Sequence, residues 1–117
     1  VASAKAFADY VNEVWPDGIP IVFSSLRDKD ITGIIKALGS SMTYLACPPL
    51  KNSRSCEPNV ILEMIRKVRP ELRTVTSTST KSALLDACEH GDVVGVVGSV
   101  YLIGEIMVDL NLKQVKP

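Results

Sequence analysis

Hydrophobic positions along the chain alternate between two spacings. Stretches with an apolar residue every three or four positions predict amphipathic helices, and short continuous apolar runs between them predict strands covered on both faces. The predicted helices include residues 2–15, 31–38, 58–68 and 102–110. A further helix is predicted between a cap at residues 77–80 and the pair His90-Gly91. The predicted strands cover residues 19–23, 42–46, 72–75 and 93–97.

Capping and breaking residues bound these elements. Ser3 can cap the first helix, and Asp28 or Asp30 can cap the second, because their side-chain oxygens accept hydrogen bonds from the free N–H groups of a helix start. Gly39 can end the second helix. Pro58 suits the first turn of the third helix, where its missing N–H costs nothing.

The order is therefore one helix followed by four strand–helix units. Strands joined by helical crossovers favour a mostly parallel sheet with helices on both faces, an α/β fold of three layers. No linker or repeat interrupts residues 1–117, so we expect a single domain. Since this architecture normally feeds its first helix from a strand, we also expect a further strand upstream of residue 1.

Composition narrows the class of partner. The 117 residues include 13 Lys plus Arg and 13 Asp plus Glu, and 46% are hydrophobic. This formally neutral, globular composition gives no electrostatic reason to expect nucleic acid or an anionic membrane as partner. No window approaches the ~18–20 apolar residues of a membrane-spanning helix, and the first residues do not resemble a signal peptide.

The cysteines and the histidine suggest no metal site. Cys47, Cys56 and Cys88 are dispersed and form no CxxC pair, which predicts reduced thiols, a cytoplasmic location and no nucleophilic role. His90 is the single histidine and precedes a glycine at a predicted helix end, where a structural role is expected.

Ligands of open α/β sheets bind at the carboxyl ends of the strands. Gly98 and Ser99 follow the last strand and offer backbone N–H groups at a helix start, although they can equally form only a turn and a cap. Lys29 follows the first strand and can reach a bound carboxylate or phosphate, or simply lie in solvent. Arg54, in a polar loop, can clamp a phosphate or be an ordinary surface residue.

Several sequence motifs are absent. The chain has no GxxxxGK[ST] phosphate loop, no GxGxxG dinucleotide fingerprint and no GxSxG nucleophile elbow. A phosphoacceptor receiver domain would require a lysine after its last strand, and none follows residues 93–97.

The segment GDVVGVVGSVYLIGEI, residues 91–106, resembles the closing strand–Gly-Ser-x-Tyr–helix element of folylpolyglutamate and dihydrofolate synthases. Asp92, Gly98, Ser99, Tyr101 and Gly104 fit that pattern. Two further segments fit in the right order, which extends the resemblance over nearly the whole chain. They are RDKDI at 27–31, which is similar to the family's DKD element, and residues 52–58, which are similar to its arginine-containing loop.

The resemblance implies the fold of a Mur-ligase carboxy-terminal domain, a three-layer Rossmann-like sheet. It implies an ATP-dependent ligase that activates folate or dihydropteroate as an acyl phosphate and joins glutamate to it. In such enzymes an amino-terminal ATPase domain, which these residues lack, holds most of the ATP, Mg²⁺ and folate. The isolated domain is then expected to be inactive.

Site residues follow from the same resemblance. Ser99 is the first candidate for contact with glutamate, followed by Tyr101, with Lys29 and Gly98 beside them. A separate group is assigned to nucleotide or domain-interface contacts and consists of Arg54, Asp28 and Asp30. The resemblance names no proton-transfer catalyst and no metal ligand.

Two other hypotheses remain open from the residues alone. One is a free-standing α/β module that binds a small anion or nucleotide at Gly98-Ser99. The other is an interaction domain whose Arg27, Lys29 and Arg54 face a protein partner.

Overall fold

The computed structural model describes residues 2–98 and residue 102. Its elements follow the predicted alternation of helices and strands. In chain order they are α1 (Ala2–Val14), β1 (Ile19–Ser24), α2 (Ile31–Leu38), the 3₁₀ turn η1 (Gly39–Ser41), β2 (Met42–Cys47), α3 (Pro58–Val68), β3 (Arg73–Thr76), α4 (Thr80–Cys88) and β4 (Gly95–Gly98). Of the predicted last helix, only Leu102 lies within the described residues; it is helical and buried.

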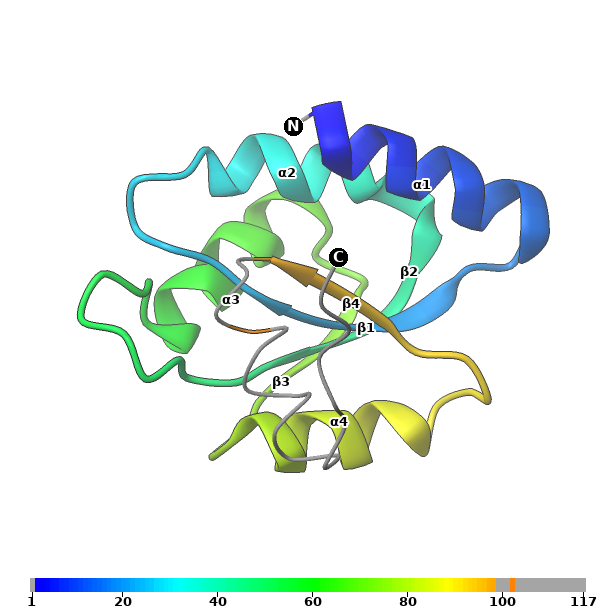
Figure 1. Ribbon diagram of the computed structural model, residues 1–117. Helices are drawn as coiled ribbons and strands as arrows, with labels where there is room; N and C mark the ends of the chain where they lie inside the picture. The colour runs from blue at the N-terminus through cyan, green and yellow to red at the C-terminus, as the bar shows by residue number, and fades with distance from the viewer. Residues whose placement is uncertain (1, 99–101, 103–117) are drawn as a thin grey trace, which may run out of the picture.

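The four strands form one sheet in the order β3-β2-β1-β4. All three pairings are parallel, which confirms the predicted α/β fold. The two central strands, β1 and β2, are almost fully buried, in keeping with their continuous apolar runs. The parallel arrangement brings the carboxyl ends of all four strands to one side of the molecule, on the left in Figure 1.

Helices cover both faces of the sheet. The three helices α1, α2 and α3 pack on one face, where Phe23 of β1 meets Ile35 of α2 and Ile61 of α3 in a single buried cluster. On the other face, α4 packs Ala83 and Ala87 against apolar side chains of β1 and β2. Figure 1 shows α1 and α2 above the sheet and α4 below it. These layers form the predicted three-layer arrangement.

Some boundaries differ from prediction. Ser3 lies inside α1 rather than before it, so it is not that helix's cap. The predicted strand 93–97 begins only at Gly95, because the connection from α4 continues through residues 92–94. In the connection after β2, predicted to be surface-exposed, Pro48 and Leu50 are buried, since their apolar rings and methyl groups help to close the core.

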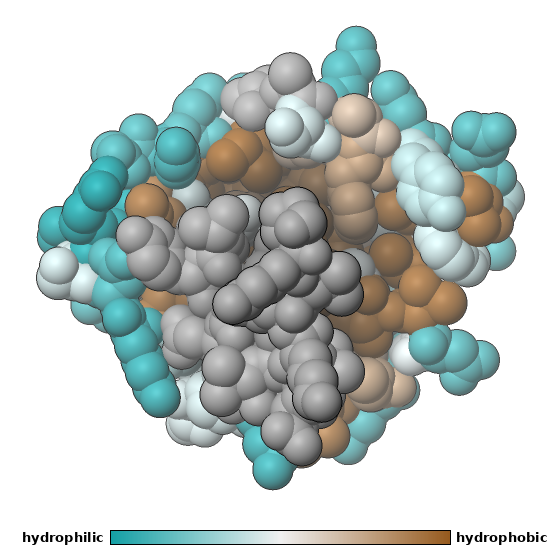
Figure 2. All heavy atoms as spheres, viewed as in Figure 1, coloured by the Kyte–Doolittle hydropathy of each residue, from teal (hydrophilic) through white to brown (hydrophobic). Residues whose placement is uncertain are grey.

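Hydrophilic side chains surround most of the outline in Figure 2, and hydrophobic residues reach the surface below α1 on the right of the view. No helix among the described residues is long and apolar enough to cross a bilayer.

Candidate functional site

Two loops at the carboxyl ends of the strands are joined by backbone hydrogen bonds. The β1–α2 loop, residues 25–30, and the β2–α3 loop, residues 48–57, lie side by side at the left of Figure 1. The Arg27 N–H donates to the Arg54 carbonyl, and the Cys56 N–H donates to the Ser25 carbonyl, each at 2.8 Å. The pairing fixes one loop against the other, so the predicted residues Lys29 and Arg54 belong to one connected unit.

Charged residues of this unit form one ion pair and one helix cap. Arg54 Nη2 lies 2.9 Å from Asp28 Oδ2, and both side chains are mostly exposed. Asp30 caps α2, because its Oδ1 accepts a hydrogen bond from the Gly33 N–H at 3.1 Å. Of the two predicted caps, Asp30 is therefore the one that the structure uses, and Asp28 pairs with Arg54 instead.

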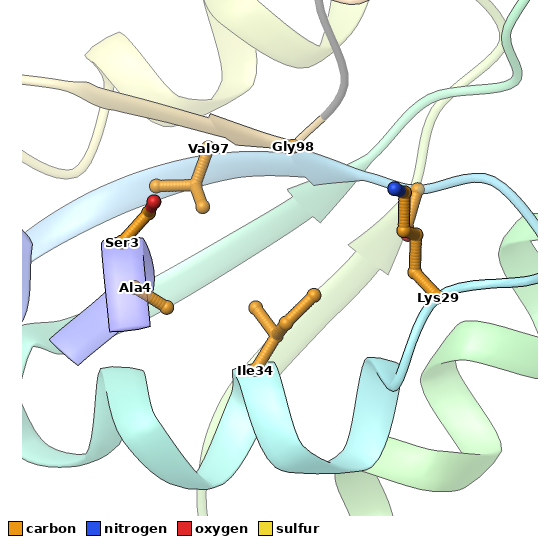
Figure 3. Close-up of a pocket in the computed structure, with 7 residues that line it drawn as sticks. Ser3, Ala4, Lys29, Ile34, Val97 and Gly98 are labelled. Atoms are coloured by element: carbon orange, nitrogen blue, oxygen red, sulfur yellow. The ribbon is translucent and has the colours of Figure 1, made fainter. Parts of the chain in front are cut away.

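A cavity of about 150 Å³ opens beside these loops. It lies between the start of α1, the β1–α2 loop, α2 and the end of β4 (Figure 3). Its lining residues are Ser3, Ala4, Ser25, Lys29, Ile34, Val97 and Gly98. Two of the sequence-predicted residues, Lys29 and Gly98, are thus brought together at one site.

Lys29 supplies the positive charge of the cavity. Its side chain reaches back from the loop, so that the amine lies beside the carboxyl end of β1 and faces the cavity (Figure 3). Within residues 2–98 no carboxylate forms an ion pair with this amine. An ammonium group at the mouth of a largely apolar cavity favours an anionic ligand group, such as a carboxylate or phosphate.

Gly98 is required by the close approach of two strands. It has a φ of 141° and is paired with Ser24 of β1. A Cβ atom at this position would overlap the Ser24 carbonyl oxygen, so no other residue fits without moving β4. The close neighbour of Gly98 is thus the β1 backbone, and a contact of its N–H group with a ligand stays a prediction. The two other predicted glutamate contacts, Ser99 and Tyr101, lie outside the described residues.

Three serines near this edge were not predicted as site residues. Ser3 and Ser25 line the cavity. Ser24, the neighbour of Ser25, is fully buried on the face of β1 that points away from the cavity. Its Oγ has no hydrogen-bond partner among the described residues. The rule that ligands bind at strand carboxyl ends selects the loop that begins at Ser24, but it singles out neither Ser24 nor Ser25 within it. No local signal places Ser3 there.

Two of the three cysteines, Cys47 and Cys56, fill space in the core. Cys47 ends β2, and its burial raises the pKa of its thiol to about 12, with a smaller contribution from the nearby Cys56. Burial also raises the pKa of Cys56. At neutral pH both thiols are protonated and poorly nucleophilic. All three cysteines are free, and Cys88 is exposed.

The geometry defines a class: a parallel α/β domain with a small, cationic, partly apolar cavity at the carboxyl ends of its strands. No protein-family model and no curated protein sequence matches the chain. Solved structures do match its fold. A folylpolyglutamate synthase from Mycobacterium tuberculosis, complexed with ADP and AMPPCP, aligns with a TM-score of 0.82 and 21% identity over 97% of this chain and 28% of that chain.

Two further matches are bifunctional folylpolyglutamate synthase/dihydrofolate synthases. One, from Yersinia pestis c092 and complexed with AMPPNP and Mn, has a TM-score of 0.77 and 23% identity over 95% of this chain and 26% of that chain. Another, with Mn, AMPPNP and L-glutamate bound, has a TM-score of 0.74 and 20% identity over 95% of this chain and 27% of that chain. This chain therefore shares the fold of about a quarter of the length of these synthases.

Proposed function

We propose that this chain is the carboxy-terminal, glutamate-binding domain of an ATP-dependent ligase that adds glutamate to folate or dihydropteroate. The observation that carries the proposal is the cavity in which Lys29 faces Gly98 across the carboxyl ends of β1 and β4. Such a site suits an amino acid with a carboxylate, and the fold is that of one part of synthases described as acting on folates.

The proposed chemistry requires positioning more than acid–base catalysis. ATP phosphorylates the carboxylate of the folate substrate, and the glutamate amine attacks the resulting acyl phosphate. A C–N bond forms, the C–O bond to phosphate breaks, and the amine loses a proton. Lys29 would hold a glutamate carboxylate while the amine stays free, and closure against a partner domain would exclude water from the acyl phosphate.

ATP and Mg²⁺ are proposed to be held mainly by an amino-terminal ATPase domain of the same protein. Among residues 2–98 no group of three His, Cys, Asp or Glu side chains comes close enough together to form a metal site. The matched synthases carry ADP or ATP analogues, two of them with Mn. With its free thiols, the protein suits a reducing compartment such as the cytoplasm.

Arg54, Asp28 and Asp30 are proposed to lie at the interface with the ATPase domain or its nucleotide. The Arg54–Asp28 pair is exposed at the outer end of the joined loops, where a partner could contact it. Asp30 would act indirectly, since its carboxylate already caps α2.

Lys29→Ala and Ser99→Ala in the full-length ligase test the proposal. Each is expected to raise the KM for glutamate by roughly tenfold or more, the effect of losing a hydrogen bond to a charged group, with little change in the KM for ATP. Lys36→Ala, an exposed lysine on α2, is the matched control. Unchanged glutamate kinetics in both variants would refute the assignments. Folate-dependent ATP hydrolysis by the isolated chain would contradict the division between domains.

A further inference from the structure

A second hollow lies at the amino ends of the strands, away from the cavity that Lys29 lines. It is lined by residues 15, 17–20, 43 and 90–93, and we call it the amino-edge hollow. Its volume of about 440 Å³ has room for a whole side chain, since one water takes only ~30 Å³ in the liquid. One wall is the α1–β1 turn and the other is the α4–β4 connection, both on the right in Figure 1.

Close packing fixes both walls of the amino-edge hollow. Gly18, at a φ of 84°, lies so near the Ser40 and Ser41 carbonyl oxygens that a Cβ there would come within 2.9 Å of each. Gly91 faces the Pro20 ring, where a Cβ would lie 3.0 Å from Cδ. A ligand therefore meets a preformed surface, and its binding requires little ordering of the protein.

The carboxylates that line the hollow favour a cation. Asp17 comes from the α1–β1 turn and Asp92 from the α4–β4 connection, so one carboxylate belongs to each wall. Both residues are exposed to water, and neither forms an ion pair within residues 2–98. No lysine or arginine is among the described residues that line the hollow. Exposed carboxylates alone attract any cation only weakly, so the kind of cation depends on the side chains beside them.

Trp15 selects the kind of cation. It lines the hollow, and its ring packs edge to face with that of Tyr10, with 6.1 Å between the ring centroids. A flat guanidinium group can stack on an indole ring and still donate several N–H groups to carboxylates, whereas a compact ammonium group does this less well. Beside Trp15, Tyr10 is 59% exposed and Val14 is 46% exposed. Apolar residues on either side of an arginine would cover these two side chains, which favours a polypeptide over a free small cation.

We infer that the amino-edge hollow binds the guanidinium group of an arginine from a polypeptide partner. The guanidinium lies on the Trp15 ring and donates hydrogen bonds to Asp17 and Asp92, and the residues beside the arginine cover Tyr10 and Val14. None of these residues belongs to the proposed glutamate site. The inference therefore does not depend on the proposed ligase.

Tryptophan fluorescence is the direct test, because Trp15 is the single tryptophan of the chain. Titration of the 117-residue chain with butylguanidine at low salt should give a saturable change in emission. Butylurea, the neutral isostere, should bind roughly tenfold more weakly, because the hydrogen bonds lose their charge. Butylammonium should bind about threefold more weakly, because it cannot stack on the ring. A parallel titration of N-acetyltryptophanamide corrects for collisional quenching.

Charge-removing variants test the two carboxylates. Asp17→Asn and Asp92→Asn keep the side-chain shape, so each should weaken butylguanidine binding by roughly twofold to fivefold, and the double variant by about tenfold. Asp9→Asn is the matched control, because Asp9 is exposed on α1 and does not line the hollow. It removes the same charge and should leave the Kd unchanged. An unchanged urea midpoint establishes that each variant is folded.

Three results would overturn the inference. One is the absence of a saturable change in emission up to about 50 mM butylguanidine, well above a Kd of 1 mM. Another is equal binding of butylurea, or equal weakening by Asp9→Asn and Asp92→Asn. The third concerns the source of the guanidinium: the blocked peptide acetyl-Leu-Arg-Leu-amide should bind about threefold more tightly than butylguanidine, through apolar contact with Tyr10 and Val14. Equal affinity of the two would refute a polypeptide partner.

Discussion

The two ends of the sheet differ in how completely their polar groups are satisfied. The carboxyl edge, with residues 24–30, 47–57 and 98, holds the cavity, the Lys29 amine and the buried Ser24 hydroxyl without a described partner. The amino edge, with residues 15–20, 39–44, 69–73 and 90–95, has a larger hollow of about 440 Å³. There, however, His90 stacks on Tyr44, and Arg69 donates to two backbone carbonyls.

The contrast shows that the size of a hollow and the number of unpaired polar groups beside it are independent properties. The amino edge holds close contacts that stabilise the fold, and its larger hollow lies between turns. At the carboxyl edge, the Lys29 amine lines the cavity without an ion-pair partner among the described residues, and the buried Ser24 hydroxyl has no described partner. Unsatisfied groups cost stability and are retained where function requires them. Substitution of Arg69 at the amino edge should therefore change mainly stability, and substitution of Lys29 at the carboxyl edge should change mainly ligand binding.

Glycine substitutions should have the largest effects. Gly98→Ala should lower the free energy of unfolding by about 3 kcal/mol or more, because its Cβ meets the Ser24 carbonyl at a φ of 141°. Gly18→Ala, at a φ of 84° and 2.9 Å from two carbonyl oxygens, should cost about 2 kcal/mol. Gly39→Ala meets no atom within 4 Å and should cost about 1 kcal/mol, for its φ of 47° alone. Urea denaturation measures all three.

If Gly98→Ala lowers the free energy of unfolding no more than Gly39→Ala does, the close approach of β4 to β1 in this structure is contradicted. The order Gly98, Gly18, Gly39 tests both edges in one series.

Substitution of Arg69 should lower stability more than substitution of Arg54 does. Arg69 Nη1 donates to the Gly39 and Met42 carbonyls at 2.7 and 2.9 Å, so Arg69→Ala should cost about 2 kcal/mol. Arg54→Ala removes an exposed ion pair and should cost about 0.5 kcal/mol or less. Thermal and urea unfolding measure both, and exposed Arg66→Ala on α3 is the control. Equal losses for Arg54 and Arg69 would contradict the contrast between the edges.

Alkaline pH should destabilise the chain through Cys47. Its thiol has a pKa of about 12 when folded, against 9.0 ordinarily, so above pH 9 the unfolded chain releases the proton first. The contribution of this thiol to the free energy of unfolding is thus fully present below pH 9. It falls as the pH rises toward 12, by up to about 1.4 kcal/mol per pH unit. Cys47→Ala should remove this share of the slope. Tyr44→Phe, from the amino-edge stack, should flatten the slope only above about pH 10, since burial raises that phenol's pKa too.

Urea unfolding at several pH values measures these slopes. Identical slopes for the parent chain and Cys47→Ala would refute the burial of a protonated thiol.

Two fully buried serines give small predicted effects with opposite signs. The Ser41 hydroxyl at the amino edge donates to the Leu38 carbonyl at 2.5 Å, so Ser41→Ala should cost about 1 kcal/mol. The Ser24 hydroxyl has no described partner, so Ser24→Ala should stabilise the chain by up to about 1 kcal/mol. Calorimetric unfolding can resolve both signs. A loss on Ser24→Ala would mean that this hydroxyl does have a partner.

Much of the fold could be predicted because its signals are local. Pro58 begins α3, Asp30 caps α2 and the apolar runs form β1 and β2 within about a residue of their expected bounds. The site was predicted less completely. Lys29 and Gly98 were named from the loops that follow strands, and both line the cavity. Ser3 was assigned to a helix cap, because a serine near a helix start gives the same local signal whether it caps the helix or faces a ligand.

The sequence by itself determined the alternation of helices and strands, the parallel sheet and the edge where a site should lie. These depend on residue spacing and backbone preference, which act over a few neighbouring positions. Only the tertiary structure decided that β1 lies between β2 and β4, and that Ser3 and Lys29 share a cavity. Strand order and contacts between distant residues depend on how the whole core packs, and no short stretch of sequence contains that information.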